Sequence, residues 1–199
     1  PDEGEIYVGD KAATIRSPRD ALDLGIGMIH QHFKLVDLFT ATENIILGLE
    51  GKLDIAEASK KVKEICDKYG FDIDPNQKIY DMSVSQKQTV EIVKVLYRGA
   101  DILILDEPTV GLDPAQVIEM RKLIRELGKA HTVILSSHIL SEVQAVCQQV
   151  LILSKGKLAA SGTLQELTAD GRSLEEVFLA LTGAQTDPEE EEEPHDSDL

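Results

Sequence analysis

Two neighbouring carboxylates, Asp106 and Glu107, directly follow the apolar run Ile102–Leu105. An uninterrupted apolar run of this length predicts a strand that is buried on both faces, as in a parallel sheet. Ligands of such sheets bind beyond the carboxyl ends of the strands, which is where these two acids would lie. One acid there can hold Mg²⁺ while its neighbour polarises an attacking water, so the pair suits hydrolysis of a magnesium-bound phosphate. The structural alternative is that Asp106 only caps a turn before Pro108.

Two further polar residues follow apolar segments and are candidates for the same rim. His138 comes after the apolar run Thr132–Leu135 and two serines, and Gln31 closes the short segment GMIHQ. Taken alone, His138 could be a neighbour of a helix N-cap, and Gln31 a plain polar residue at a strand end. Parallel strands present their carboxyl ends at one edge of a sheet, so we expect both side chains to approach the two carboxylates.

The segment ILILDEPTVGLDP (102–114), with His138 downstream and Gln31 upstream, resembles the ATP-binding cassette (ABC) ATPases that power membrane transporters. The resemblance covers about residues 1–182 and implies that the protein binds ATP together with Mg²⁺. It implies that Gln31 is the Q-loop glutamine, which approaches Mg²⁺ and the attacking water. It also implies that Asp106 is the Walker B aspartate on Mg²⁺ and that Glu107 is the catalytic base.

Two more positions take roles from the same resemblance. Asp113 matches the D-loop aspartate, which communicates across an ATPase dimer, and it also suits the N-cap of a helix opened by Pro114. His138 matches the switch histidine, which contacts the γ-phosphate. These residues share the order and spacing of the family, which argues against a chance assembly of unrelated polar residues.

Residues 82–88, MSVSQKQ, stand where the family carries its signature, LSGGQ. By resemblance, Ser83 and the N–H groups after it bind the γ-phosphate of ATP held by the opposite subunit, as an anion at a helix N-terminus. Gln86 matches the signature glutamine, but Val84 and Ser85 replace both glycines. A Cβ at these positions limits positive φ and close approach of the backbone to a phosphate, which weakens the predicted half-site. The alternative is that the segment is only a capped helix start.

The phosphate-binding loop that should accompany these motifs is missing from the sequence. A P-loop needs G-x-x-x-x-G-K-[ST], so that backbone N–H groups, a lysine and a hydroxyl surround the phosphates and Mg²⁺. The nearest candidate, GLEGK (48–52), is followed by Leu53 in place of the hydroxyl and has the wrong glycine spacing. By family order the loop should precede Pro1, which is not an initiating Met. We therefore expect an N-terminally truncated domain that alone binds ATP weakly or not at all.

The elements that would position these residues follow from hydrophobic patterns and capping signals. Hairpins are expected over 5–13 and 150–162, and helices over 54–70, 85–98 and 174–182. Strands and helices alternate from residue 100 on, which predicts a parallel sheet with covered faces.

With the resemblance, this pattern gives an α/β fold: a P-loop NTPase-like, mostly parallel sheet core with a helical subdomain, lacking the P-loop strand. We expect residues 1–39 and 100–182 to form the partial ATPase core. Residues 40–99 would form the helical subdomain that carries the signature, and residues 183–199 an acidic disordered tail.

The composition is that of a globular protein, with 199 residues, 42% hydrophobic and 28% charged, which allows a core without a metal or disulfide. The net charge of −16 argues against a nucleic-acid-binding surface. Residues 187–199 hold eight acids and no Lys or Arg, so this tail supplies half of that excess. Cys66 and Cys147 lie far apart in helical patterns and are expected to be reduced, as in a cytosolic protein. No apolar run reaches the length needed to cross a bilayer.

Within the family, residues 1–108 resemble ATPases of simple-sugar, nucleoside or basic-membrane-protein importers, whereas residues 109–182 resemble ATPases of export and gliding-motility-type permeases. Divergence, a recombinant gene or an artificial join would each give this pattern. The resemblance implies as partners a second ATPase subunit, transmembrane permease subunits and, in an importer, a solute-binding protein. It places the chain peripherally at the cytoplasmic face of the cell membrane. Two alternatives stay open: a degenerate, non-catalytic cassette that pairs with or regulates a complete one, and a plain α/β binding domain.

Overall fold

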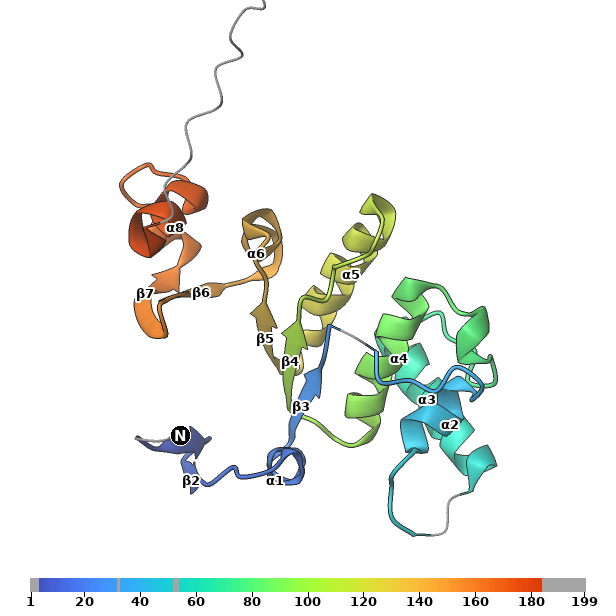
Figure 1. Cartoon of the computed structure of the whole chain (residues 1–199). Coiled ribbons are helices and arrows are strands. Elements are labelled where there is room, and N and C mark those ends of the chain that lie inside the picture. Colours follow the sequence, from blue (N-terminus) through green and yellow to red (C-terminus); the bar gives the residue numbers. More distant parts are fainter. Residues whose placement is uncertain (1–3, 32, 52–53, 184–199) are drawn as a thin grey trace, which may run out of the picture. The chain divides into compact units, whose positions relative to one another are not determined.

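The computed structural model describes residues 4–31, 33–51 and 54–183 (Figure 1). The chain divides into two compact units, one over residues 1–146 and one over residues 147–199. The acidic tail predicted over 183–199 lies, apart from Gly183, outside the described residues.

The first unit joins a hairpin, a short helix and the strands of a parallel sheet, and a mainly helical segment is inserted between two of these strands. In chain order its elements are β1 (Ile6–Val8), β2 (Lys11–Ala13), α1 (Pro18–Asp23), β3 (Ile26–Ile29), α2 (Ala41–Ile46), α3 (Ile55–Tyr69), the 3₁₀ turn η1 (Ile79–Asp81), α4 (Val84–Tyr97), β4 (Ile102–Asp106), α5 (Pro114–Leu127), β5 (Thr132–Ser136) and α6 (Leu140–Val146).

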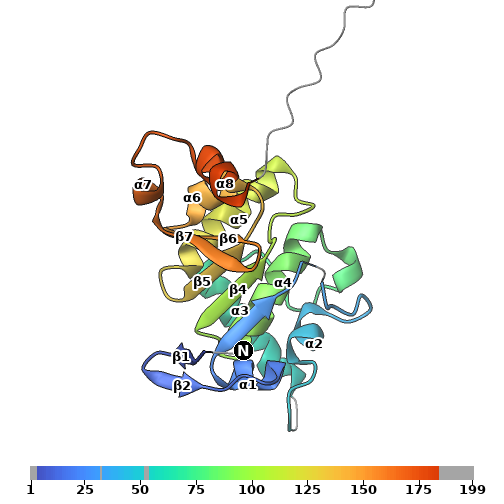
Figure 2. The same ribbon diagram turned by 60° about the vertical axis from the view of Figure 1, so that its left-hand side comes forward.

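The three strands of the sheet run parallel in the order β3-β4-β5 (Figure 2). Their register pairs Ile29 with Leu105 and Leu105 with Leu135, and it pairs Asp106 with Ser136 one residue later. The strands therefore end at one common rim. This confirms the predicted parallel sheet and places the residues that follow each strand at the same edge.

One face of this sheet is covered by helices. Leu103 and Leu105 have no exposed surface, and they pack with side chains from α4 and α5. The helical side chains of this cluster are Ile92 and Val95 from α4, and Met120, Ile124 and Leu127 from α5. Burial on this face anchors β4, the strand that leads directly into the acidic pair.

The opposite face is only partly covered, so the prediction that β4 and β5 are buried on both faces was wrong. Met28, Ile104 and Ile134 lie side by side across this face, and Met28 is 44% and Ile134 50% exposed. Because α4 and α5 both pack on the Leu103 face, the described part of this unit leaves these apolar side chains open to solvent.

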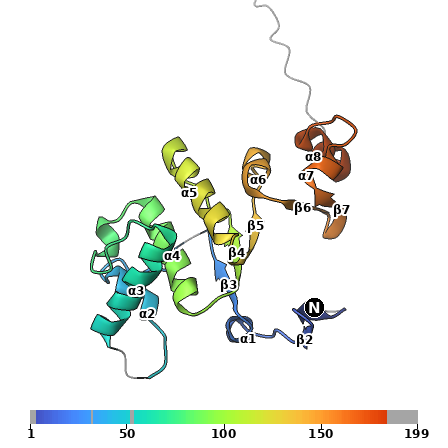
Figure 3. The ribbon, with the colours of Figure 1, turned by 180° about the vertical axis from the view of Figure 1, so that it is seen from behind.

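Helices α2, α3 and α4 lie together in the inserted segment (Figure 3), and their buried side chains form a core separate from that of the sheet. Asp54 caps α3 by accepting hydrogen bonds from two backbone N–H groups, and Gly70 ends the helix in the left-handed conformation, which agrees with the helix predicted over 54–70. Helix α4 buries side chains on two sides. Val90 and Val93 face the helical cluster, whereas Ile92 and Val95 face the sheet. Helix α4 therefore joins the inserted segment to the sheet.

The second unit consists of the antiparallel strands β6 (Gln149–Ser154) and β7 (Lys157–Thr163) with the helices α7 (Leu164–Leu167) and α8 (Leu174–Thr182). Lys155 and Gly156 turn the hairpin with φ values of 50° and 75°, which is the backbone of a tight two-residue turn. Ser173 caps α8 in a capping box with Glu176. The predicted hairpin and last helix are thus confirmed.

Both cysteines are free thiols. Burial raises the pKa of the Cys66 thiol to about 11 and raises the pKa of Cys147 as well. Both side chains therefore stay protonated at neutral pH.

Candidate functional site

The acidic pair lies at the carboxyl rim of the parallel sheet. Asp106 ends β4, and the hydroxyl of Ser136, its partner on β5, donates a hydrogen bond to its Oδ1 at 2.5 Å. This bond uses one carboxylate oxygen and orients Asp106 along the rim. The second oxygen accepts no hydrogen bond from the described residues, so it remains available to a ligand.

Glu107 forms hydrogen bonds with residues at the end of the neighbouring strand β5 and just after it. Its N–H donates to the Ser136 carbonyl at 3.0 Å, and its Oε1 accepts the backbone N–H of His138 at 3.1 Å. The Nδ1 atom of His138 lies 2.8 Å from the same Oε1. Because an ionised carboxylate only accepts hydrogen bonds, Nδ1 is the nitrogen that donates here, which leaves Nε2 for another partner.

The backbone of Glu107 is strained. Its φ is 47°, in the left-handed region that residues with a side chain seldom adopt. Such conformations cost on the order of 1–3 kcal/mol and persist where surrounding bonds hold them, often at functional sites. At Glu107, the hydrogen bonds to Ser136 and His138 stabilise this backbone conformation. The Glu107 side chain is 19% exposed and that of His138 is 73% exposed, so the pair faces solvent through the histidine.

A further hydrogen bond joins the loop that follows β4 to helix α6, which follows β5. Thr109, two residues after Glu107, donates its hydroxyl hydrogen bond to the carboxylate of Glu142 on α6. Thr109 is 5% and Glu142 4% exposed, so this carboxylate is buried. A buried carboxylate without a donor is costly. The Thr109–Glu142 bond therefore helps to fix the loop after Glu107 against the helix after His138.

We expect Thr109→Val to lower the free energy of unfolding by about 1–3 kcal/mol, because the buried Glu142 carboxylate loses its hydroxyl donor. Urea unfolding followed by circular dichroism measures this difference. Thr109→Ser is the matched control, since it keeps the hydroxyl group. Equal stability of the valine and serine variants would contradict the assignment.

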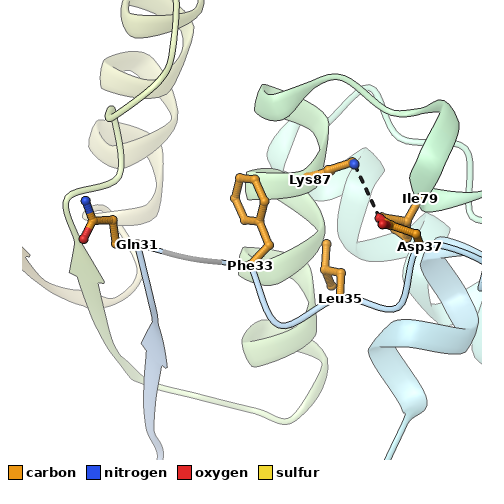
Figure 4. A pocket seen from close by; sticks show the side chains of 6 residues that line it. All are labelled: Gln31, Phe33, Leu35, Asp37, Ile79 and Lys87. Carbon is orange, nitrogen blue, oxygen red and sulfur yellow. Dashed lines mark ion pairs between the residues drawn. The ribbon is translucent and has the colours of Figure 1, made fainter.

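Gln31 lies at the same rim, two residues beyond Ile29, which pairs with Leu105. It is exposed and lines an open groove, the Gln31 groove, together with five residues of the following loop and the helical segment. These are Phe33, Leu35, Asp37, Ile79 and Lys87. Figure 4 shows the Gln31 amide turned away from the Lys87–Asp37 ion pair on the other side of the groove. Gln31 thus stands between the acidic rim and the helical segment.

The remaining predicted site residues cap helices. Ser83 and Gln86 form a reciprocal capping box at the start of α4, with bonds of 3.2 and 3.0 Å. Asp113 caps α5 by accepting the N–H of Gln116 at 2.9 Å, which confirms its predicted N-cap position. Among the described residues, no hydrogen bond or ion pair links these three side chains to Asp106, Glu107 or His138.

The donor set at the rim suits a magnesium ion that is held mainly by phosphate and water. In the described part of the chain, no group of three or more His, Cys, Asp or Glu side chains is placed to hold a metal by itself. Mg²⁺ bound to a nucleotide needs only one or two protein oxygens, because phosphates and water supply the rest. The free oxygen of Asp106 and the amide oxygen of Gln31 are suitable ligands of this kind.

The fold and the site together define the class of protein. A parallel sheet with an Asp–Glu pair at its carboxyl rim, a histidine joined to that pair and an inserted helical segment form an α/β domain of the ABC ATPase type. Residues 1–110, more than half of the chain, match the family described as ABC transporter. The chain belongs to this family.

Two import proteins are among its relatives. The chain is 49% identical over 162 residues to the nucleoside import ATP-binding protein NupA of Lactococcus lactis subsp. cremoris, and 48% identical over 162 residues to the guanosine import ATP-binding protein NupO of Bacillus subtilis. Each match covers 79% of this chain and 32% of the relative, so the chain spans about a third of their length. At that coverage the likeness to importers extends past residue 108. The separate likeness of 109–182 to export-type ATPases stays a prediction.

Solved structures agree with the fold. CbiO1 of Clostridium perfringens, part of the ABC transporter complex cbiONQ, matches with a TM-score of 0.73 and 28% identity, over 90% of this chain and 73% of that one. A dimeric ATP-binding cassette in a post-hydrolysis state, bound to ADP and Pi, matches with a TM-score of 0.64 at 24% identity, over 82% of this chain and 74% of that one. None of the helices in the described ranges has both the length and the apolar character needed to cross a bilayer.

Proposed function

We propose that this chain is part of the ATP-binding and ATP-hydrolysing subunit of a membrane importer. The observation that carries the proposal is the joined arrangement of Asp106, Glu107 and His138 at the rim of a parallel sheet in a member of the ABC family. Carboxylates at this position are suited to metal binding and to activation of water, which are the two requirements of phosphoanhydride hydrolysis.

Each rim residue has a role that its contacts support. Glu107, held by His138 and partly shielded from solvent, would accept a proton from the attacking water. Asp106 and Gln31 would hold Mg²⁺, which when bound neutralises charge on the β- and γ-phosphates. His138 would use its free Nε2 to contact the γ-phosphate.

The signature segment would act in a dimer with a second ATPase subunit. There Ser83, Gln86 and the N–H groups at the start of α4 would bind the γ-phosphate of ATP on the other subunit, and Asp113 would lie at the shared interface. Ser83 and Gln86 are engaged in a capping box, and α4 begins at Val84, so this half-site would be weaker than one built from glycines.

We further propose that the phosphate-binding loop is supplied by polypeptide outside residues 1–199, because these residues contain no G-x-x-x-x-G-K-[ST] segment. In the described part of the chain, β5 pairs only with β4. An unpaired strand edge with a half-exposed Ile134 beside it is a suitable place for a further parallel strand. A strand paired there would end at the same rim, and its loop would lie beside Asp106 and His138.

A fusion experiment tests this function. A strand–GxxxxGK[ST]–helix segment from an ABC ATPase is joined in front of Pro1, and phosphate release from MgATP is measured. We expect the fusion to hydrolyse ATP, and a variant with alanine for the lysine of the added segment to lose this activity. A folded fusion that binds MgATP but releases no phosphate would overturn the catalytic assignment.

The same outcome would favour the second candidate function, a non-catalytic cassette that pairs with a complete ATPase subunit or regulates it. The observation in its favour is the replacement of both signature glycines by Val84 and Ser85. The intact pair of Glu107 and His138 argues against it, because a site without catalysis has no need to hold a strained glutamate.

The names of the relatives support a proposal for the transported substrate class. Because NupA and NupO are named for nucleoside and guanosine import, we propose a nucleoside as the cargo. Transmembrane permease subunits and a solute-binding protein would be the partners, at the cytoplasmic face of the cell membrane. The Gln31 groove and the loop around it would contact the permease.

A further inference from the structure

A buried carboxylate on α4 holds the backbone of the loop that follows Gln31. Oε1 of Glu91 accepts the backbone N–H of Lys34 at 2.7 Å. Glu91 is 8% exposed, and its other oxygen lies 3.8 Å from Nζ of Lys94, one turn further along the helix. The same ammonium group donates to the Lys34 carbonyl at 3.5 Å. Glu91, Lys94 and the Lys34 peptide groups thus form a closed junction, the Glu91 junction.

The contacts of the Glu91 junction offset the free-energy cost of burying the Glu91 carboxylate. A carboxylate removed from water must be paired with a charge and must receive hydrogen bonds. Lys94 supplies the charge, and the Lys34 N–H supplies a charge-assisted hydrogen bond. Because one of these partners is main chain, the junction fixes the path of the loop as well as a side chain.

The next part of the loop has an independent anchor. The side-chain oxygen of Asn44 accepts the N–H of Val36 at 2.7 Å, and its amide nitrogen donates to the Val36 carbonyl at 3.1 Å. Asn44 belongs to α2, so this anchor does not involve α4. The loop would therefore keep its attachment to the helical segment without Glu91, and the Glu91 junction adds a specific link to α4.

Helix α4 connects this link to two other parts of the molecule. Its N-cap Ser83 and its first-turn residue Gln86 belong to the signature segment, and its Ile92 and Val95 pack on the sheet that ends in the acidic rim. Lys34 is three residues beyond Gln31 in sequence. A displacement of α4 would therefore be passed through the Glu91 junction to the Lys34 peptide groups, in the loop that follows Gln31.

We propose that Glu91 is a positioning residue that couples the signature helix to Gln31. Its catalytic consequence rests on the proposed function, whereas the coupling itself is a property of this chain. Glu91 would not touch the nucleotide. It would act through its hydrogen bond to the Lys34 N–H, which holds the loop after Gln31 in a fixed position relative to α4.

Amide hydrogen exchange of the chain tests the coupling without any nucleotide. In Glu91→Leu the Lys34 amide loses its acceptor and should exchange about tenfold faster or more, as expected for loss of a charge-assisted hydrogen bond. In Glu91→Gln the side chain still offers an oxygen, so most of the protection should return. The Val36 amide, which Asn44 holds, is the internal control.

If the leucine variant does not fold, Glu91→Asp replaces it in the same exchange measurement. Aspartate keeps the charge, but its side chain is one methylene shorter and its carboxylate would lie farther from the Lys34 N–H. Unchanged exchange at Lys34 in the variant that folds would overturn the proposal. Faster exchange spread evenly along α4 would also overturn it, since that result indicates a general stabilising role only.

Catalysis provides the second readout, in the fusion that carries a phosphate-binding loop. Misplacement of Gln31 should lower kcat of Glu91→Leu by about tenfold and leave KM for MgATP within about twofold, with recovery in Glu91→Gln. A rise of KM at constant kcat would count against positioning. If the unaltered fusion hydrolyses no ATP, the proposed function fails, and the exchange measurement alone decides the coupling.

Discussion

Replacing Glu107 by Gln in the fused form of the protein is expected to slow ATP hydrolysis by about 10²–10⁴-fold, the usual contribution of a general base. The amide has nearly the shape of the carboxylate, and its oxygen can still accept the His138 N–H that now lies 3.1 Å from Oε1. The backbone conformation at φ 47° should therefore persist. What the amide cannot do is take a proton from water, so the loss is chemical.

Phosphate release at saturating MgATP gives the rate, and size-exclusion chromatography with labelled ATP shows whether the variant accumulates as an ATP-bound dimer. The matched control is Glu126→Gln, which neutralises a carboxylate on α5 that pairs with the exposed Lys129. Turnover in Glu107→Gln equal to that of the control would refute the assignment of Glu107.

Local features of this protein were readable from the sequence because they depend on a few neighbouring residues. Asp113 caps its helix as predicted, and Asp54 and Ser173 cap the helices predicted over 54–70 and 174–182, since a short polar side chain bonds to backbone two or three residues away. The parallel sheet was predicted from the alternation of strands and helices after residue 100. The order of apolar strands and polar residues also placed Gln31 and the acidic pair at one edge.

Contacts between distant parts of the chain were not readable in the same way. Thr109 and Glu142 are 33 positions apart, and Lys34 and Glu91 are 57 apart, and no local pattern marks either pair. The one available signal was Glu91 itself, a charged residue between Val90 and Ile92 in an apolar stretch of helix. The exposed face at Ile134 was also missed, because burial depends on what covers a strand as well as on its own residues.

The second large effect concerns ATP affinity. We expect residues 1–199 alone to bind MgATP with a Kd weaker than about 1 mM, and the fusion with a phosphate-binding loop to bind roughly a thousandfold more tightly. A P-loop supplies backbone N–H groups and a lysine to the phosphates. Three charge-assisted hydrogen bonds at about 1.5 kcal/mol each amount to ~4.5 kcal/mol, which corresponds to that factor. At the rim, the described residues offer the Asp106 and Gln31 oxygens, which would act on the phosphates through Mg²⁺, and the His138 ring.

Titration with a fluorescent ATP analogue in the presence of Mg²⁺ measures both affinities. The fusion with alanine for the lysine of the added segment is the control, because it keeps the added strand and the loop backbone but loses the charge on the phosphates. Its affinity should fall between the other two. Micromolar binding by residues 1–199 alone would show that the rim and α4 bind the phosphates without a phosphate-binding loop. The proposal that an added loop completes the site would then be wrong.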